Sequence, residues 1–241
     1  MKEKKHCSAI VLAAGSGKRM NSDTKKQYML IYDKPVIYYS LKAFQESFVD
    51  EIVLVVSPGD VSYCQKEIVE KYGFTKVSKI VEGGKERYHS VAAGLKSVAK
   101  EGFVFIHDGA RPMITEYILE RALTCVEACN ACVVGMPVKD TIKIAGADKN
   151  IAETPNRNLV WMVQTPQVFE YNLIKDAYEE LLVNEQQLLA QGISVTDDAM
   201  VVETLSGQKV KLVEGSYENI KITTPEDIPL AECFLKAGNE K

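Results

Sequence analysis

Residues 9–20 read Ala-Ile-Val-Leu-Ala-Ala-Gly-Ser-Gly-Lys-Arg-Met, and the run Lys25-Lys26-Gln27 follows shortly afterwards. An apolar run of strand length therefore ends in two alanines and a glycine, which begin a turn of small residues. The charged side chains of this turn are Lys18, Arg19, Asp23, Lys25 and Lys26. Small residues let backbone N–H groups approach a ligand closely, and clustered cations suit a ligand with several negative charges. The stretch predicts a triphosphate site at the carboxyl end of a first β-strand.

The chain as a whole is not basic, so an anion site must be a local cluster of cations. The formal net charge of −4 over 241 residues argues against a protein that binds nucleic acid or a membrane surface through general basicity. A chain of this length is long enough to bury one full core. The partners expected from charge are therefore small anionic molecules, with no nucleic acid and no membrane.

The chain also lacks the features of an exported or membrane protein. No apolar run approaches the ~20 residues needed to cross a bilayer, and the charged start Met1-Lys2-Glu3-Lys4-Lys5 does not resemble a secretory signal. Six cysteines scattered over 241 residues do not suggest a disulfide framework. We expect a cytoplasmic protein with reduced thiols.

Strand and helix patterns alternate through the first 138 residues. After the first strand, apolar runs predict strands at 51–56, 76–81, 103–106 and 131–138, and helical spacing predicts helices at 35–47, 61–72, 86–100 and 115–128. This alternation is typical of a doubly wound α/β domain with a mostly parallel sheet. Ligands of such sheets bind beyond the carboxyl ends of the strands. The loops 15–26, 83–85 and 108–112 all fall there and predict one composite site.

The pattern changes at Lys139. Residues 139–163 alternate polar and apolar side chains around turn residues and predict an extended β-hairpin arm, which packs either on its own domain or on a partner subunit. We then expect a turn at Thr165-Pro166-Gln167, a helix at 171–189, a helix capped by Thr196 and ending at Leu205, strands at 209–213 and 219–222, and a final helix starting at Thr224. The simplest partition is a single domain, 1–241, with 139–163 as an inserted arm.

The first loop does not match two common phosphate-binding fingerprints. Its glycines lack the spacing of a P-loop, and Met20 stands where a dinucleotide fingerprint has its third glycine. The stretch instead resembles the N-terminal signature of sugar nucleotidyltransferases. Downstream, the following motifs stand in order: Lys26-Gln27-Tyr28, Gly83-Gly84-x-x-Arg87-x-x-Ser90, His107-Asp108-Gly109-Ala110-Arg111-Pro112, Pro137-Val138-Lys139-Asp140-Thr141, Arg157-Asn158, Gln164-Thr165-Pro166-Gln167, Thr196-Asp197-Asp198-Ala199 and Asn219-Ile220-Lys221.

Together these motifs resemble the 2-C-methyl-D-erythritol 4-phosphate cytidylyltransferase family of the non-mevalonate isoprenoid pathway, over residues 8–235. One departure is Asn156, where the family often carries Asp before the arginine. The resemblance implies a Rossmann-like nucleotidyltransferase fold and transfer of CMP from CTP to a sugar-alcohol phosphate with release of pyrophosphate. It also implies Mg²⁺ or another divalent cation bound with CTP.

The resemblance further implies roles for residues in the matched motifs. Arg19 and Lys26 would be catalytic and stabilise the transition state. The implied nucleotide-binding residues are Ala13, Ala14, Gly15, Gly17, Gly83, Ser90 and Asp108, and Asp108 would also contact the metal. The residues that would position the substrate phosphate are Arg157, Lys221, Thr141 and Arg111. In the family the arm reaches across a homodimer, so Thr141 and Arg157 would serve the partner's site.

Two other functions are compatible with parts of this pattern. Ribitol-5-phosphate cytidylyltransferase shares most of this scaffold and is the nearest enzymatic alternative. A nucleotide-binding regulatory protein without turnover is a more distant one, and the full set of four cations (Arg19, Lys26, Arg157 and Lys221) argues against it. Cys125, Cys129 and Cys132 have the spacing of iron–sulfur ligands, but burial in a helix and strand explains them better.

Overall fold

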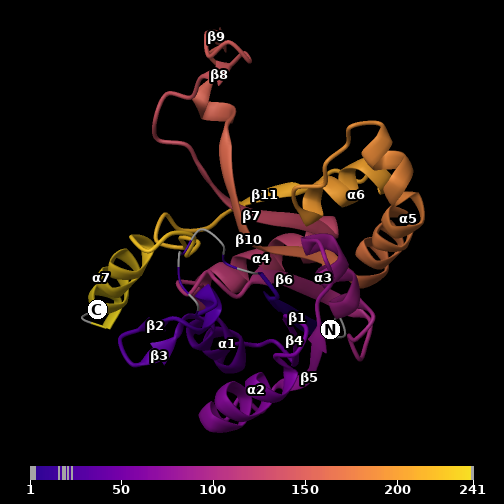
Figure 1. The fold of residues 1–241 in the computed structure, drawn as a ribbon. Coiled ribbons are helices and arrows are strands. Elements are labelled where there is room, and N and C mark those ends of the chain that lie inside the picture. The colour runs from indigo at the N-terminus through magenta and orange to yellow at the C-terminus, as the bar shows by residue number, and fades with distance from the viewer. Residues whose placement is uncertain (1–3, 16, 18–19, 21, 23, 240–241) are drawn as a thin grey trace.

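The computed structural model describes residues 4–15, 17, 20, 22 and 24–239 (Figure 1). Its centre is a seven-stranded sheet. In spatial order the strands are β11 (Lys211–Glu214), β7 (Ala131–Pro137), β10 (Trp161–Glu170), β6 (Gly102–Asp108), β1 (His6–Ala13), β4 (Glu51–Val56) and β5 (Val77–Glu82). The pairs β1–β4, β1–β6, β4–β5 and β7–β11 are parallel, which confirms the predicted mostly parallel sheet.

Strand β10 is the exception and lies in the middle of the sheet. It runs antiparallel to both of its neighbours, and Gln167 pairs with Ile106 of β6 on one side and with Val133 of β7 on the other. The sequence pattern predicted a mostly parallel sheet and gave no strand order. In the structure β6 and β7 are separated by a strand that comes later in the chain.

Helices cover both faces of the sheet (Figure 1). One face carries α1 (Val36–Glu46), α2 (Val61–Tyr63) with the π-helix η3 (Cys64–Glu70), and α4 (Glu116–Cys129). The other carries α3 (Arg87–Leu95), α5 (Tyr171–Ala190) and α6 (Asp198–Ser206). Along β1 the buried side chains alternate: Val11 joins the first core and Ile10 the second. This two-sided burial explains why the central strands read as continuous apolar runs.

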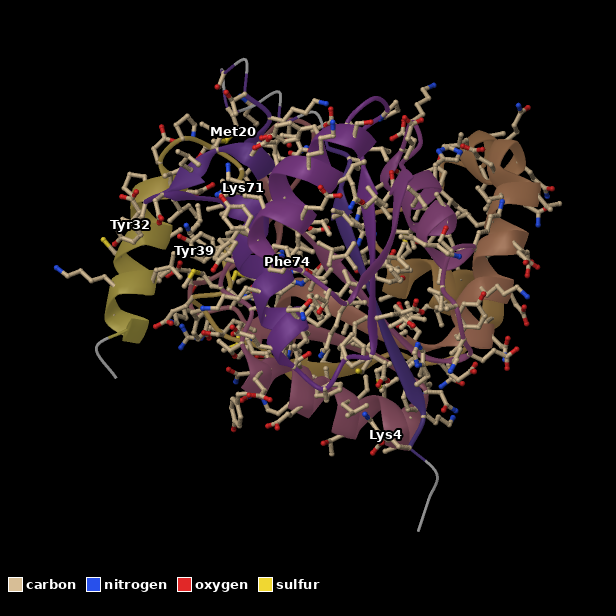
Figure 2. The ribbon with its side chains drawn as sticks, turned by 90° about the horizontal axis from the view of Figure 1, so that it is seen from below. Lys4, Met20, Tyr32, Tyr39, Lys71 and Phe74 are labelled. Atoms are coloured by element: carbon tan, nitrogen blue, oxygen red, sulfur yellow. The ribbon has the colours of Figure 1, made fainter. Side chains whose placement is uncertain are left out.

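A third, smaller core joins the two ends of the chain. The C-terminal helix α7 (Asp227–Asn239) packs against the short hairpin of β2 (Leu30–Ile31) and β3 (Lys34–Pro35). Ile31, Val36, Ile222 and Ala231 are fully buried there. Figure 2 shows Tyr32 beside α7, where its hydroxyl donates to the carbonyl of Glu232 at 2.8 Å. The segment before α7 is thereby held near the loop that follows β1.

The arm predicted for 139–163 is present as a hairpin. Strands β8 (Ile144–Ala145) and β9 (Ile151–Glu153) pair antiparallel near its tip, and a 3-10 turn, η4 (Arg157–Leu159), precedes β10. The Val138 N–H donates to the Val160 carbonyl at 3.0 Å where the arm leaves the sheet. Figure 1 shows the arm extending away from the sheet rather than lying on it.

Among the described residues, no helix combines the length and the apolar character needed to cross a membrane.

Several local predictions are wrong, including the start of the final helix, which begins at Asp227 rather than Thr224. Thr165-Pro166-Gln167 is not a turn but part of β10, because the β7 register shifts between Val163 and Gln167 and the Asn219 side chain donates to the Thr165 carbonyl at 3.0 Å. Residues 219–222 form no strand, since single contacts hold them instead of a ladder. The cap of α6 is Asp197 rather than Thr196, because its carboxylate accepts the Met200 N–H at 3.0 Å.

Glu51 joins four segments beneath the amino end of the sheet. Its buried carboxylate accepts hydrogen bonds from the Ser8 hydroxyl at 2.7 Å, the Ala99 N–H at 2.9 Å and the Ser78 hydroxyl at 3.0 Å. The helix predicted to reach Lys100 ends at Leu95, and the Ala99 N–H donates to Glu51 instead of continuing it. Burial alone would raise the pKa of Glu51, but these hydrogen bonds lower it below its ordinary value.

We predict that Glu51→Gln lowers the free energy of unfolding at pH 7 by about 1–3 kcal/mol, because the hydrogen bonds lose a charged acceptor. The folded pKa lies below the unfolded value of 4.5, so the contribution of the carboxylate is complete above that value and is lost as the pH falls through the folded pKa. Denaturant titrations should therefore show a smaller difference between the two proteins at about pH 3.5. An equal difference at both pH values would contradict the assignment.

Candidate active site

A pocket of about 360 Å³ opens at the carboxyl edge of the sheet, beyond the ends of β1 and β6. Three loops surround it, as expected for a doubly wound domain. Its lining residues are Leu12, Ala13, Ala14, Gly15, Lys26, Gln27, Gly84, Lys85, Glu86, Arg87, Ser90, Asp108, Ala110 and Lys221. Backbone from the first turn therefore faces the start of α3, with cations at the rim and a carboxylate at the base.

One wall of the pocket is built from residues that leave no room for a side chain at Gly83. A Cβ atom there would lie 2.5 Å from the Ala14 Cβ and 2.6 Å from the Ser90 Oγ. Ser90 in turn accepts the Gly84 N–H at 3.2 Å. The backbone of the 83–84 turn is thus held against the turn that follows β1, and a flat ligand group could approach both.

Asp108, at the end of β6, is a carboxylate that lines the pocket. One oxygen lies 2.6 Å from the Nζ of Lys221, and the other lies 3.5 Å from the Nε of Arg87. Burial by itself would raise the pKa of Asp108, but Arg87 and Lys221 hold it far below its usual range. The carboxylate is therefore ionised at neutral pH and carries cations from two distant segments.

Arg87 has a second, fully buried partner. Both terminal nitrogens of its guanidinium donate to the two oxygens of Asp198 at 2.7 Å, in a bidentate pair. The Tyr178 hydroxyl donates to the same carboxylate. Burial alone would lower the pKa of Arg87, but Asp198 and Asp108 raise it well above its ordinary value. Arg87 thus faces the pocket as a permanent cation whose direction is fixed from α6.

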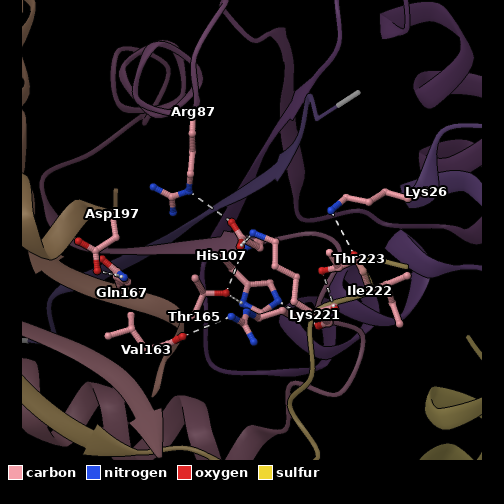
Figure 3. A network of polar contacts seen from close by, with 12 residues as sticks. Lys26, Arg87, His107, Val163, Thr165, Gln167, Asp197, Lys221, Ile222 and Thr223 are labelled. Atoms are coloured by element: carbon pink, nitrogen blue, oxygen red, sulfur yellow. Dashed lines mark hydrogen bonds and ion pairs between the residues drawn. The ribbon is translucent and has the colours of Figure 1, made fainter. Parts of the chain in front are cut away.

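A buried imidazole supports the other side of Asp108 (Figure 3). The Thr165 hydroxyl accepts the backbone N–H of Asp108 at 3.1 Å and lies 3.0 Å from the Nδ1 of His107. Burial lowers the pKa of His107 to about 4, so the ring is neutral at pH 7. Its Nε2 then donates to the Arg111 carbonyl at 3.2 Å. These hydrogen bonds hold the backbone at Asp108 and at Arg111, within the predicted motif 107–112.

Lys26 enters the pocket from the 3-10 turn η2 (Lys26–Tyr28). Its Nζ donates to the carbonyl of Ile222 at 3.1 Å, next to Lys221 in the chain (Figure 3). The buried Gln27 side chain donates to the Ala13 carbonyl at 2.7 Å and so ties the turn to the end of β1. Residues predicted from separate motifs are thereby brought together by hydrogen bonds.

The pocket unites seven of the predicted site residues: Ala13, Ala14, Gly15, Lys26, Ser90, Asp108 and Lys221. Gly83 lies directly behind its wall, and Gly17 adopts the left-handed conformation at φ +63° beside Lys26. Arg111 is directed at the Asn219 carbonyl, 2.8 Å from its Nη1, rather than into the pocket. Arg19 lies outside the described residues.

Thr141 and Arg157 are exposed on the arm and do not line this pocket. Lys25, counted among the loop cations, points to Asp60 at 2.6 Å instead of the pocket. Sequence reasoning did not single out Arg87 or Asp198 as site residues. Both stand inside quoted motifs, and an arginine four residues after a glycine pair at the start of a helix was the available signal.

The donor set fits a divalent cation that arrives with a triphosphate. Asp108 offers one carboxylate, and within the described ranges no group of three or more His, Cys, Asp or Glu side chains could hold a metal ion. Mg²⁺ is often bound through one or two carboxylates with the remaining positions filled by substrate phosphates and water. The lining holds two acidic residues, Glu86 and Asp108, and Asp108 lies beside the cations Arg87 and Lys221, so the carboxylates available match that pattern.

Comparison with known proteins agrees with the motifs. The family model for IspD, 2-C-methyl-D-erythritol 4-phosphate cytidylyltransferase, matches residues 7–237. The chain belongs to this family. It is 53% identical over 230 residues to the enzyme of that name from Lachnospira eligens, covering 95% of this chain and 99% of the relative. It is 50% identical over 229 residues to the one from Lachnoclostridium phytofermentans, covering 95% and 96%.

Solved structures extend the similarity to the fold. The crystal structure of 4-diphosphocytidyl-2C-methyl-D-erythritol synthase from Anaerococcus prevotii superposes with a TM-score of 0.82 at 36% identity, covering 96% of each chain. The enzyme of the same family from Thermus thermophilus gives a TM-score of 0.73 at 27% identity, covering 94% of this chain and 98% of its own. The cytidylyltransferase fold predicted from the motifs is confirmed.

We predict that Asp198→Asn lowers the free energy of unfolding by about 3–5 kcal/mol, because the half-buried guanidinium of Arg87 loses its bidentate, fully buried counter-charge. Denaturant unfolding followed by circular dichroism measures the loss. The control is Glu67→Gln, which breaks an exposed pair with Lys71 and should change stability by less than about 0.5 kcal/mol. Equal effects of the two substitutions would contradict the role of Asp198.

Proposed function

We propose that the chain transfers CMP from CTP to 2-C-methyl-D-erythritol 4-phosphate and releases pyrophosphate. The observation that carries the proposal is the pocket itself. Arg87 and Lys221 pair with the ionised Asp108, and Lys26 lines the same pocket beside the backbone of the first turn. The chain belongs to this cytidylyltransferase family over nearly its whole length. Ribitol-5-phosphate cytidylyltransferase is not favoured, because the relatives reported above bear the methylerythritol name.

The chemistry needs charge compensation more than proton transfer. A phosphate monoester has its second pKa near 6, so the acceptor is largely ionised at pH 7. One of its oxygens forms a bond to the α-phosphorus of CTP, while the bond from that phosphorus to the bridging oxygen of the β-phosphate breaks and pyrophosphate leaves with the electron pair. Two polyanions must meet, and negative charge moves onto the leaving group. Preorganised cations lower this barrier without a general base.

The residues of this chain divide the work. The small-residue turn at Ala13–Gly15 and the wall at Gly83 and Ser90 would hold the nucleotide, because both present backbone close to the pocket. Lys26, together with Arg19, would stabilise charge that develops at the α-phosphate and the leaving pyrophosphate. Lys221 would bind the acceptor phosphate once it exchanges Asp108 for that anion. Asp108 would hold Mg²⁺ with the triphosphate, and the ion would supply further charge stabilisation when bound.

The arm supports a homodimer. Its apolar side chains are unusually open to solvent: Leu159 is 79% exposed and Ile151 64%. Exposed apolar clusters mark surfaces that bind other proteins. Arg157 lies beside Leu159, is exposed and donates to the Lys139 carbonyl at 3.4 Å within the arm itself. We propose that the arm inserts Thr141 and Arg157 into the pocket of a second copy.

A cytoplasmic location agrees with the six free cysteines.

The direct test measures pyrophosphate release for each nucleoside triphosphate against a panel of polyol phosphates, with and without Mg²⁺. We expect turnover with CTP and 2-C-methyl-D-erythritol 4-phosphate, and dependence on the divalent cation. Release with ribitol 5-phosphate alone would overturn the acceptor assignment. Binding of CTP without any release would favour a regulatory protein.

Subunit complementation tests the shared site. We expect Lys26→Ala and Arg157→Ala to fold normally, and Lys26→Ala alone to reduce turnover by roughly 100-fold, about 3 kcal/mol of barrier. If the arm serves the partner, each mixed dimer contains one intact site, so co-refolded chains should regain about a quarter of wild-type activity. No recovery in mixed dimers of demonstrated size would place both residues in the site of one chain. A monomer by size-exclusion chromatography would contradict the dimer.

A further inference from the structure

The turn that carries Lys26 is fastened on both sides of this residue. Its following neighbour, Gln27, is bound to β1 through the Ala13 carbonyl. The residues on either side of that pair, Lys25 and Tyr28, both reach Asp60, which lies 35 residues from Lys25 at the start of α2. The Lys26 backbone therefore lies between contacts to two different elements.

Asp60 does not do what its position would suggest. It occupies the N-cap position of α2, yet its side chain makes no capping hydrogen bond. Instead one carboxylate oxygen accepts from the Nζ of Lys25 at 2.6 Å and from the hydroxyl of Tyr28 at 2.9 Å. Residues 25 and 28 face the same way across one 3-10 turn, because their side chains eclipse at a spacing of three. A single carboxylate oxygen therefore binds the residue before η2 and the last residue of η2.

A thiol completes the cluster of Lys25, Tyr28, Asp60 and Cys64. The Tyr28 oxygen lies 3.1 Å from the Sγ of the buried Cys64. Tyrosine has one hydroxyl proton, and Tyr28 donates it in the hydrogen bond to Asp60. The Cys64 thiol must therefore be the donor to the Tyr28 oxygen. The Tyr28 ring also packs edge-on against Tyr63, with ring centroids 5.0 Å apart. All polar atoms of the hydroxyl are satisfied in one geometry.

This cluster differs from an ordinary surface ion pair. The Asp60 side chain is 18% exposed and that of Lys25 35%, whereas Asp33, paired with its neighbour Lys34 elsewhere on the surface, is 77% exposed. Exposed pairs contribute little because water competes for both charges. Lys25 is directed to Asp60 and does not line the pocket, whereas its neighbour Lys26 does.

We propose that Asp60 and Tyr28 are positioning residues that hold the η2 turn so that Lys26 faces the reacting phosphates. The inference rests on the proposed function of Lys26. Asp60 is not among the residues that line the pocket, and its carboxylate contacts the turn through Lys25 and Tyr28. Misplacing a catalytic group by about 1 Å can reduce a rate by roughly 100-fold, so a loose η2 turn should lower kcat. The KM for CTP should change little, because the nucleotide wall is built from other segments.

The kinetic experiment compares Asp60→Asn, Tyr28→Phe and Asp60→Glu with two controls. We expect kcat to fall roughly 10- to 100-fold in the first two variants with KM for CTP within about twofold, and partial recovery in Asp60→Glu, which keeps the carboxylate. Tyr63→Phe removes a neighbouring hydroxyl and Asp33→Asn breaks the exposed pair; both should leave kcat unchanged. Wild-type kcat in Asp60→Asn and Tyr28→Phe would overturn the proposal, as would a rise in KM alone.

A second readout does not depend on turnover. The Tyr28 N–H donates to the Lys25 carbonyl at 2.8 Å and the Met29 N–H to the Lys26 carbonyl at 3.3 Å. Hydrogen exchange of a peptide spanning 24–30 should therefore accelerate at least about tenfold in Asp60→Asn and not in Tyr63→Phe. Unchanged exchange would overturn the anchor even if the enzyme is active. A wild-type protein without pyrophosphate release would overturn the proposed function, while exchange would still decide whether Asp60 holds the turn.

Discussion

The buried carboxylate of Asp108 sets the constraint that organises the pocket. An anion removed from water is stable only where cations and hydrogen bonds replace its hydration. Two cations come from distant segments: Arg87 from the start of α3, and Lys221 from the segment before α7. Because Arg87 also pairs with the fully buried Asp198, charges of alternating sign run across the carboxyl edge of the sheet. The same row that stabilises the fold presents preorganised cations to an incoming polyanion.

Much of this arrangement follows from the sequence. Parallel strands end at one edge, so the loops after β1, β5 and β6 had to meet, and Ala13, Ser90 and Asp108 do line one pocket. The arm was visible from its alternating pattern and its turn residues. Periodicity, however, reports burial and not which strand lies alongside, so the antiparallel insertion of β10 could not be derived. Thr165-Pro166 looks like a turn in the sequence because proline cannot donate to a strand ladder. In the structure the segment stays in β10, and the Asn219 side chain donates to the Thr165 carbonyl.

Charge pairing was the other limit. Counting cations near Gly15 gave Lys25 and Lys26 equal weight, whereas the fold directs the first to Asp60 and the second to the pocket. Adjacent acidic residues at Asp197 and Asp198 look alike in a helix start, yet one caps α6 and the other holds Arg87. Local patterns identify which residues carry charge. Only contacts between segments far apart in the chain decide which of these side chains line the pocket.

The central place of β10 also bears on how the chain assembles during synthesis. Strands β1, β4, β5 and β6 can pair as soon as residues up to Asp108 have left the ribosome, but the outer edge of β6 then has no neighbour. That edge stays open while α4, β7 and the whole arm are made, and unpaired edges invite intermolecular pairing. The Asp108 N–H gains its Thr165 partner only when β10 closes the gap, and Lys221 follows later still. Asp108 therefore has its full set of partners only after the sheet is closed and the segment before α7 has been made.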